Sequence, residues 1–514
     1  MADPYYITTA IAYPNGKPHI GHAYEAIAAD AIARFQRMRG RDVRLVTGTD
    51  EHGLKMAQAA RSAGFETLDF ATEMSNYFRQ MCDTLNISYD DFVRTTEPRH
   101  HAASEAIWQA LEANGDLYLD RYEGWYSVRD EAFYDESELI DGEGGQRLSP
   151  QKTPVEWTVE ESWFFRLSKY RDYLIELNEK AGFLEPESRR NEVLSFLKGQ
   201  DLRDLSVSRT SFAWGVPVPG STGHVMYVWV DALTTYLTGI GFPEREGDFA
   251  QFWPADLHLI GKDIVRFHAV YWPAILKSAG LAPPRSIFGH GFLLHRGEKM
   301  SKSLGNVVDP LELAERFGVD QLRYFLLREV SFGQDGTFSA NAIVTRCNAE
   351  LANSFGNLAQ RVLAMIFKNL DGQVPAWGND PKDLQMRTSV RSSVLNDVSR
   401  EFANLAFSVG LEAWMKSVFA CNAYVDEMAP WALRKSDPAR MAEVLGTLYR
   451  CIIDLAIALI PVTPTSANRL LDAMGVDPAD RNYGWIANGN PSKPAIKLPV
   501  PIFPRLELPV ETAV

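Results

Sequence analysis

The alternation of apolar and polar positions divides the chain into parts of different architecture. Up to about residue 115, short apolar runs typical of buried strands alternate with segments of helical period. That pattern predicts a doubly wound α/β domain. Strands are expected at residues 5–11 and 43–47, and helices at 23–39 and 54–62.

The α/β pattern is interrupted and later returns. Residues 115–224 interleave aromatic with charged side chains and lack this alternation, which predicts an inserted domain. Strands are expected again at 225–230, 257–260 and 286–294. Beyond about residue 345 only amphipathic helical patterns remain, so a helical bundle is expected there, and the Pro-rich residues 498–509 are expected to pack back across the body of the protein.

The turn between the first strand and the first helix carries two histidines and a glycine. A helix N-terminus has unpaired N–H groups and a partial positive charge, which suit a phosphate. His19 and His22 lie one helical turn apart, so both imidazoles can donate hydrogen bonds to phosphoryl oxygens. Gly21 leaves room for a nucleotide against the backbone. An ordinary turn with incidental histidines is the alternative.

Clusters of polar and aromatic residues stand where the predicted strands end. Ligands of doubly wound sheets bind beyond those carboxyl ends, near the point where the strand order reverses. The clusters lie at 14–22, 48–53, 231–236, 261–268 and 299–303. Each has a structural alternative: Asp50 could cap a helix, Trp229 and Phe267 could belong to the core, and Lys299 and Lys302 could be surface lysines. The expected common rim favours one ligand site.

Composition narrows the class of protein. The chain has 514 residues, 46% of them hydrophobic and 23% charged, as in a multidomain globular protein. Its four cysteines are far apart and form no C-x-x-C pair, which argues against a disulfide framework or a cysteine zinc site and suits a reducing cytoplasm. The first strand follows Met1 so closely that no signal peptide is expected, and the most apolar stretch, 451–462, is too short to span a membrane.

Charge gives no support to a nucleic-acid partner. The 52 basic and 66 acidic side chains leave a net charge of −14. Net charge, however, does not exclude local basic patches. The candidates are Arg189 with Arg190, Arg203 with Arg209, and Arg434 with Lys435, and each of them could equally be a solvated surface.

Two short motifs, in this order around an insertion, carry a resemblance to a known family. They are His19-Ile20-Gly21-His22 and Lys299-Met300-Ser301-Lys302-Ser303, and both match the signatures of class I aminoacyl-tRNA synthetases. Segments 12–16, 47–53, 227–232, 260–263 and 429–431 resemble the methionyl-tRNA synthetase family, and the similarity runs from residue 5 to about residue 475. The insertion contains no cysteine, so the chain resembles the zinc-free branch and no protein-bound zinc is expected.

The resemblance implies a domain for each part of the chain. The fold class is a Rossmann-type doubly wound parallel sheet with an inserted connective domain, followed by an all-α bundle. The implied domains are the two halves of the catalytic domain (1–114 and 225–290), a connective insertion that contacts the tRNA acceptor end (115–224), the KMSKS loop and stem-contact region (291–344), and an α-helical anticodon-binding domain with a C-terminal tail (345–514). The additional C-terminal domain of some relatives is absent, so a cytoplasmic monomer is expected.

The implied reaction joins methionine to ATP as methionyl-adenylate and then passes the methionyl group to tRNA. His19, His22, Lys299 and Lys302 are implied to be catalytic, acting on the phosphates. Gly21, Gly261, Asp263 and Lys302 are implied to bind ATP, Asp263 through the ribose hydroxyls. The methionine carboxylate is itself the nucleophile, so no general base is required. Mg²⁺ is expected to arrive with ATP, without a protein site of its own.

The methionine site is implied to combine one carboxylate with apolar walls. Asp50 would be the partner of the α-ammonium, and a polarizable thioether favours aromatic and apolar neighbours. The other residues carried over from the family are Ile11, Tyr13, His52, Trp229, Ala232, Tyr236, Ile264, Phe267 and His268.

The helical domain is implied to read the anticodon of elongator and initiator tRNA(Met). Trp431 is expected at a helix boundary, where it can stack on a base, and Asn357 and Arg361 lie one turn apart on another helix. The alternative is that Trp431 anchors the bundle and the other two are solvated. Neither a DNA nor a membrane partner is expected.

Other functions remain open at this point. A class I synthetase for leucine, isoleucine or valine would carry a large editing domain, and residues 115–224 are too few to hold one. A nucleotidyltransferase acting on a small acceptor would not need the helical third of the chain. A non-catalytic RNA-binding paralogue would be expected to lack motif residues, and none is missing.

Overall fold

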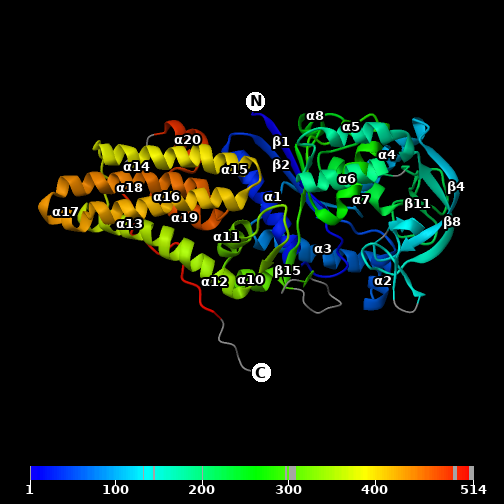
Figure 1. Cartoon of the computed structure of the whole chain (residues 1–514), viewed down its shortest axis with the longest axis horizontal. Helices are drawn as coiled ribbons and strands as arrows, with labels where there is room; N and C mark the ends of the chain where they lie inside the picture. The colour runs from blue at the N-terminus through cyan, green and yellow to red at the C-terminus, as the bar shows by residue number, and fades with distance from the viewer. Residues whose placement is uncertain are drawn as a thin grey trace, which may run out of the picture.

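The computed structural model describes residues 2–130, 132–142, 145–199, 201–295, 298–299, 308–489 and 495–508. Figure 1 shows an elongated molecule, with an α/β body and its inserted domain at one end and a helical bundle at the other. Among these residues no helix is long and apolar enough to cross a membrane.

A six-stranded parallel sheet forms the centre of the catalytic body. Its order is β3-β2-β1-β13-β14-β9, and every neighbouring pair is parallel. The strands are β1 (Pro4–Thr9), β2 (Asp42–Thr49), β3 (Asp91–Arg94), β9 (Leu184–Glu185), β13 (Leu257–Gly261) and β14 (Ile287–His290). The helices are α1 (Ile20–Met38), α2 (Leu54–Ala63), α3 (Thr67–Thr84), α4 (Pro98–Ala113), α7 (Val228–Thr238), α8 (Asp248–Phe252) and α9 (Trp272–Ser278). The sheet confirms the predicted doubly wound class, and its order reverses between β1 and β13, where a ligand crevice is expected.

The prediction of a strand at 225–230 is wrong beyond its second residue. β12 covers only Val225–Met226 and pairs with β11 (Ser208–Arg209), outside the central sheet. α7 begins at Val228. Because this helix is buried on nearly all sides, its sequence reads as a continuous apolar run, which periodicity alone cannot distinguish from a buried strand. Trp229, Ala232 and Tyr236 therefore lie on a helix.

The strand predicted at 286–294 is two strands in different sheets. β14 ends at His290, and β15 (Leu293–His295) pairs with β16 (Glu298–Lys299) and β17 (Gly336–Phe338). The chain therefore leaves the central sheet just before the region that carries Lys299 and Lys302.

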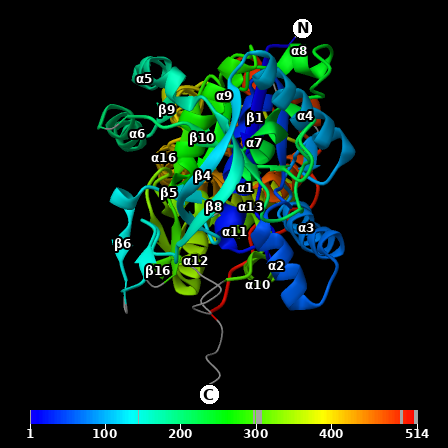
Figure 2. The ribbon, with the colours of Figure 1, turned by 90° about the vertical axis from the view of Figure 1, so that its right-hand side faces the viewer.

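The inserted residues form a second, antiparallel sheet. Its order is β10-β8-β4-β5, and Figure 2 shows the long β4–β8 ribbon. The elements are β4 (Leu117–Ser127), β5 (Ala132–Tyr134), β6 (Ile140–Asp141), β7 (Arg147–Leu148), β8 (Glu156–Phe165), α5 (Arg171–Glu179), α6 (Glu187–Gly199) and β10 (Leu205–Ser206). β9 comes from the same stretch of chain, yet it forms the outer edge of the catalytic sheet.

From residue 308 on, the described chain is helical apart from β17, and beyond about residue 345 this confirms the predicted helical bundle. Its helices are α10 (Pro310–Phe317), α11 (Val319–Glu329), α12 (Ala340–Cys347), α13 (Asn357–Asn369), α14 (Pro381–Ser392), α15 (Ser399–Ala403), α16 (Phe407–Met428), α17 (Pro430–Ser436), α18 (Pro438–Leu459), α19 (Pro464–Ala473) and α20 (Tyr483–Asn488). Residues 495–508 lie against this bundle, where Leu506 exchanges two 2.8 Å hydrogen bonds with Asn348. Over residues 498–508 this confirms the expected packing of the tail.

A buried ion pair joins the catalytic body to the bundle. Arg323 of α11 and Asp30 of α1 are both fully buried, with 2.6 Å between Nη2 and Oδ2. The same guanidinium donates to the carbonyl oxygens of Leu85, Pro461 and Val462, at 3.0–3.1 Å. Nearby, Phe35 of α1 makes edge contacts with Phe402 and Tyr483 of the bundle. The two halves thus share one continuous core.

Candidate active site

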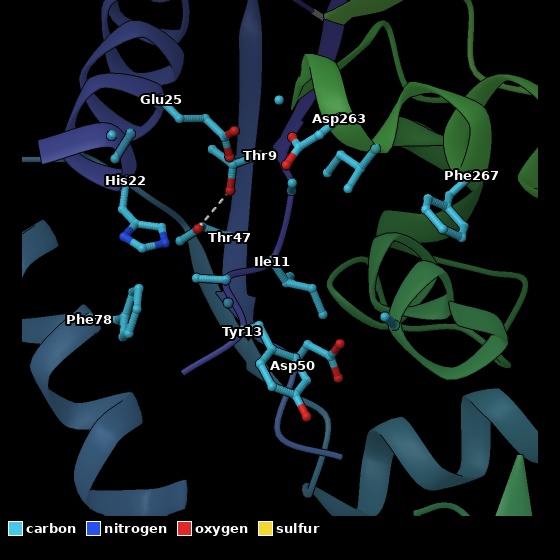
Figure 3. A pocket seen from close by; sticks show the side chains of 18 of the residues that line it. Thr9, Ile11, Tyr13, His22, Glu25, Thr47, Asp50, Phe78, Asp263 and Phe267 are labelled. Atoms are coloured by element: carbon cyan, nitrogen blue, oxygen red, sulfur yellow. Dashed lines mark hydrogen bonds between the residues drawn. The ribbon is translucent and has the colours of Figure 1, made fainter. Parts of the chain in front are cut away.

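A cavity of about 510 Å³ lies at the carboxyl ends of β1 and β13, where the strand order reverses. Figure 3 shows its walls, with α1 on one side and the segment after β13 on the other. The predicted residues that line it are Ile11, Tyr13, His19, Gly21, His22, Asp50, Trp229, Ala232, Tyr236, Gly261, Asp263, Ile264, Phe267 and His268. Residues from four of the five predicted clusters therefore meet at one place.

The other predicted residues lie elsewhere. His52 does not line the cavity but is buried behind its wall. Lys299 lies in β16, where its backbone pairs with that of Leu294. Lys302 lies outside the described residues, and Asn357, Arg361 and Trp431 belong to the helical bundle.

The N-terminus of α1 holds both motif histidines in a capping arrangement. His19 is the N-cap, and its Nδ1 accepts a 3.1 Å hydrogen bond from the N–H of Gly21. In return, Nδ1 of His22 accepts from the N–H of His19 at 3.1 Å. Because both Nδ1 atoms are acceptors, the neutral rings carry their protons on Nε2. The backbone thereby sets both imidazoles as Nε2–H donors at a helix N-terminus.

Gly21 has a local reason to be glycine. The rings of His19 and His22 lie 3.8 Å apart between centroids. A Cβ on residue 21 would stand 2.9 Å from Cε1 of His19, closer than carbon atoms pack. The glycine is therefore required for His19 to fold back over the helix end.

Asp50 is held beside the chain that follows β1. The N–H of Ala12 donates to the carbonyl of Gly48 at 3.0 Å, and the N–H of Asp50 donates to that of Ala12 at 2.8 Å. These bonds continue the β1–β2 pairing past both strands, which places Ile11 and Tyr13 next to Asp50, as Figure 3 shows. α2 begins only after Gly53, so Asp50 is not its cap.

The opposite wall is aromatic and uncharged. The rings of Trp229 and Phe267 stack at 3.8 Å. Nδ1–H of His268 donates to the carbonyl of Ile264 at 2.9 Å, and its Nε2 lies 2.7 Å from the hydroxyl of Tyr236. Burial lowers the pKa of His268 to about 4, so the ring is neutral at pH 7. Its Nε2 therefore accepts a hydrogen bond from the hydroxyl of Tyr236. The wall offers polarizable surface and no charge, which suits a thioether.

Glu25 and His290 are cavity residues that the sequence analysis did not single out. Oε2 of Glu25 and Nε2 of His290 are 2.7 Å apart. Burial raises the pKa of Glu25, although the hydrogen bond from His290 acts in the opposite direction. For His290 burial acts to lower the pKa, but the hydrogen bond and charge of Glu25 outweigh it, so the pKa of His290 is raised. Glu25 is three residues after His22, on the same helix face, and His290 ends β14. Both signals were in the sequence: helical spacing from a motif residue, and position at a strand end.

One residue of an expected basic patch, Arg209, is not on the surface, whereas its expected neighbour Arg203 is exposed. Arg209 is 1% exposed, and its guanidinium carbon lies 4.4 Å and 5.6 Å from the ring centroids of Tyr227 and Tyr126. Its Nη1 also donates to Ser206 Oγ at 2.9 Å. The guanidinium is therefore part of the interior of the molecule.

The three predicted anticodon residues lie on the bundle, and two of them touch. Trp431 is in the first turn of α17, which confirms its place at a helix boundary, and it is 50% exposed. The guanidinium carbon of Arg361 lies 5.4 Å from the Trp431 ring, and its Nη2 pairs with Asp426 at 3.1 Å. Asn357 is exposed at the start of α13. An exposed, half-stacked tryptophan is a poor anchor for a helical core and offers a face for a base.

The sheet order, the inserted domain and the histidine-capped cavity together define a class I aminoacyl-tRNA synthetase. The family described as tRNA synthetases class I (M) matches residues 5–363. Methionine–tRNA ligase of Brucella suis is 54% identical over 506 residues, covering 98% of both chains. The structure of Mycobacterium tuberculosis methionyl-tRNA synthetase in complex with methionyl-adenylate superposes with a TM-score of 0.95 at 53% identity, covering 98% of this chain and 100% of that one. Its apo form gives 0.89 at 49% identity, covering 99% of each. The chain belongs to the methionyl-tRNA synthetase family.

Metal ligands do not gather in the described part of the chain. No group of three or more His, Cys, Asp or Glu side chains is placed there to hold an ion. The four cysteines are all buried as free thiols. The absence of protein-bound zinc remains a prediction, which elemental analysis of the purified protein tests.

Proposed function

We propose that this protein attaches methionine to tRNA(Met) in two steps, through methionyl-adenylate. The observation that carries the proposal is that the two sides of one cavity suit two different ligand groups, a phosphate and an amino acid with an apolar side chain. Histidine N–H donors at a helix N-terminus form one side, and Asp50 facing an uncharged aromatic wall forms the other. A solved relative of 53% identity holds methionyl-adenylate.

In the first step the methionine carboxylate attacks the α-phosphate of ATP and pyrophosphate leaves. The carboxylate is ionised at neutral pH, so the protein has to align it and stabilise negative charge. The Nε2–H groups of His19 and His22 are directed at the phosphates, and Lys302, with Lys299, draws off charge on the leaving pyrophosphate. Mg²⁺ enters with ATP as part of the substrate. In the second step a terminal ribose hydroxyl of the tRNA attacks the carbonyl of methionyl-adenylate, an ester bond to the methionyl group forms, the bond to the phosphate breaks and AMP leaves with loss of the hydroxyl proton.

The remaining cavity residues bind the two substrates. Asp263, with the backbone at Gly261, takes the ribose of ATP, and Gly21 lets the nucleotide approach α1. Asp50 pairs with the methionine ammonium. The methionine side chain lies against the wall formed by Ile11, Tyr13, Trp229, Ala232, Tyr236, Ile264, Phe267 and His268. The four free cysteines fit action in a reducing cytoplasm, where we place the enzyme as a monomer.

ATP–pyrophosphate exchange with each amino acid in turn tests this function. Exchange should depend on methionine and should be absent with leucine, isoleucine or valine. Exchange driven by another amino acid would assign the cavity to another substrate. Methionine-dependent exchange without charging of tRNA(Met) would favour a transferase with a small acceptor.

Lys302→Ala should cripple adenylate formation and spare methionine binding. A preorganised contact to charge that develops in the transition state contributes about 2.7–4 kcal/mol, or two to three decades in rate. Exchange kinetics measure the rate, and calorimetric titration measures methionine affinity. Lys416→Ala, an exposed lysine of the bundle, is the control and should change neither. Lost methionine affinity in Lys302→Ala would contradict the assignment.

Trp431→Ala should impair tRNA charging and leave exchange intact. Anticodon bases, with Asn357 and Arg361 beside Trp431, are read by stacking and edge hydrogen bonds, and stacking on a tryptophan contributes roughly 1–3 kcal/mol per base. The kcat/KM for tRNA(Met) should therefore fall by about one to two decades. Phe65→Ala removes a comparably exposed ring (52% against 50%) from the catalytic body and should have no effect. An equal loss in both assays, with a lower melting temperature, would show that Trp431 stabilises the bundle.

A further inference from the structure

Asp231 forms a buried tie between three elements behind the cavity. The residue is fully buried on α7. Its Oδ2 accepts from Nδ1 of His52, and its Oδ1 accepts from Nε2 of His100, each at 2.6 Å. His100, on α4, also bonds Thr238 Oγ1 at 2.9 Å, seven residues or about two turns further along α7. Both carboxylate oxygens are therefore engaged by imidazoles from outside the helix.

The two faces of α7 have different partners. Trp229, Ala232 and Tyr236 follow one another at helical spacing and line the cavity. Asp231, Thr234 and Thr238 follow the same spacing on the opposite face, which is buried against other parts of the body. A hydrogen bond to Asp231 on the buried face of α7 consequently fixes the position of Trp229 and Tyr236, which lie on the face toward the cavity.

His52 connects the tie to the other wall. It follows Asp50 by two residues at the end of β2, and its ring packs edge-on against that of Trp214 with 5.5 Å between centroids. Nε1–H of Trp214 in turn donates to the carbonyl of Glu51 at 2.6 Å. Asp50 and His52 are thereby held in one rigid stretch of backbone.

The two hydrogen bonds to Asp231 are strong because a fully buried carboxylate without partners would be energetically costly. Burial acts to raise the pKa of Asp231, but the charges and hydrogen bonds of His52 and His100 outweigh it and hold that pKa well below its usual range. Charge-assisted hydrogen bonds of this kind are short and geometrically restrictive. The bond from His52 consequently sets the spacing between α7 and the segment that follows β2, and the bond from His100 sets the spacing between α7 and α4.

We propose that Asp231 is a positioning residue that sets the distance between Asp50 and the aromatic wall of α7, and so the amino-acid length that the cavity accepts. His52 takes part from behind the wall, as the donor that links Asp231 to the Asp50 segment. The inference rests on the proposed function, because methionine is the ligand whose ends the two walls would hold.

Asp231→Asn tests the proposal with little change in volume. An asparagine offers one N–H₂ group where a carboxylate offered two acceptors, so one imidazole N–H loses its partner and α7 is released. We expect the KM for methionine in ATP–pyrophosphate exchange to rise about tenfold or more, with the KM for ATP unchanged. Discrimination against norleucine and ethionine should weaken in the same variant, because the wall no longer has one position.

Four further variants separate positioning from mere stability. Thr234→Val alters the same buried face, where Thr234 Oγ donates to its own helix at Val230, and should leave both KM values unchanged. Thr238→Val removes the support of His100, together with a 3.2 Å bond to the carbonyl of Thr234 within the helix, and should raise the methionine KM less than Asp231→Asn does. Adding His52→Asn to Asp231→Asn should cost less than His52→Asn alone, since both act through one bond.

Each result decides the matter. A methionine KM equal to wild type in Asp231→Asn and Thr238→Val, with only a lower melting temperature, would make the network structural and overturn the proposal. Equal increases in both KM values would do the same. The proposed function fails separately, if the wild-type protein shows no methionine-dependent exchange.

Discussion

Asp50→Ala should weaken methionine binding by about two decades or more, because a partly buried ammonium that loses its partner costs roughly 3–5 kcal/mol. Asp50 is held next to Ile11 and Tyr13 by the backbone bonds that extend the β1–β2 pairing. Calorimetric titration with methionine measures the loss directly.

Two comparisons make that result specific. The affinity for ATP should not change, since the proposed ATP site lies toward α1 and Asp263. Asp42→Asn removes a carboxylate from the opposite, exposed end of β2 and should leave methionine binding intact. Methionine affinity preserved in Asp50→Ala would mean that another group receives the ammonium.

Arg323→Met should lower the free energy of unfolding by about 3–5 kcal/mol, because it leaves the fully buried Asp30 without its main partner. It also removes the donors to the carbonyls of Leu85, Pro461 and Val462. Chemical denaturation followed by circular dichroism measures the loss. The KM for methionine and for ATP should stay at wild-type values, since neither residue lines the cavity.

A second substitution and a control sharpen this test. Adding Asp30→Asn should recover part of the loss, because the buried carboxylate whose charge Arg323 balanced is then absent, although the pair of Asp30 with Arg34 is lost as well. Lys416→Met breaks an exposed pair with Glu412 at 3.2 Å and should cost less than about 1 kcal/mol. A cost for Arg323→Met as small as that would mean that the buried pair contributes no more than a surface one.

Strand-end residues were the most predictable part of this protein. Alternation located β1, β2 and β13, and the rule for doubly wound sheets then predicted from the sequence alone that His19, Asp50 and Asp263 share one site. Periodicity failed at α7, where burial on nearly all sides removes the polar positions that mark a helix. Arg209 shows a second limit, since a guanidinium between aromatic rings has the same sequence signature as a solvated one.

For His52 the role implied by the family resemblance differs from the position that the structure shows. The resemblance assigned it to methionine, and the structure places it behind the wall with its ring nitrogen on Asp231. No pattern in the sequence reveals this bond, because it joins residues 179 positions apart. Glu25, by contrast, could have been inferred from helical spacing after His22.

The shared core has a consequence for dissecting the chain. The composition changes near residue 345 and suggests a convenient place to cut, but Arg323 and Phe35 cross that line into the helical half. A catalytic fragment ending there would present bare aromatic rings and unbonded N–H groups to water, and would be expected to aggregate during expression. The catalytic and helical parts, which look like separate modules in the sequence, are therefore not expected to fold independently. To study the catalytic half as a separate chain, it should be co-expressed with the helical half, so that the two fragments can assemble.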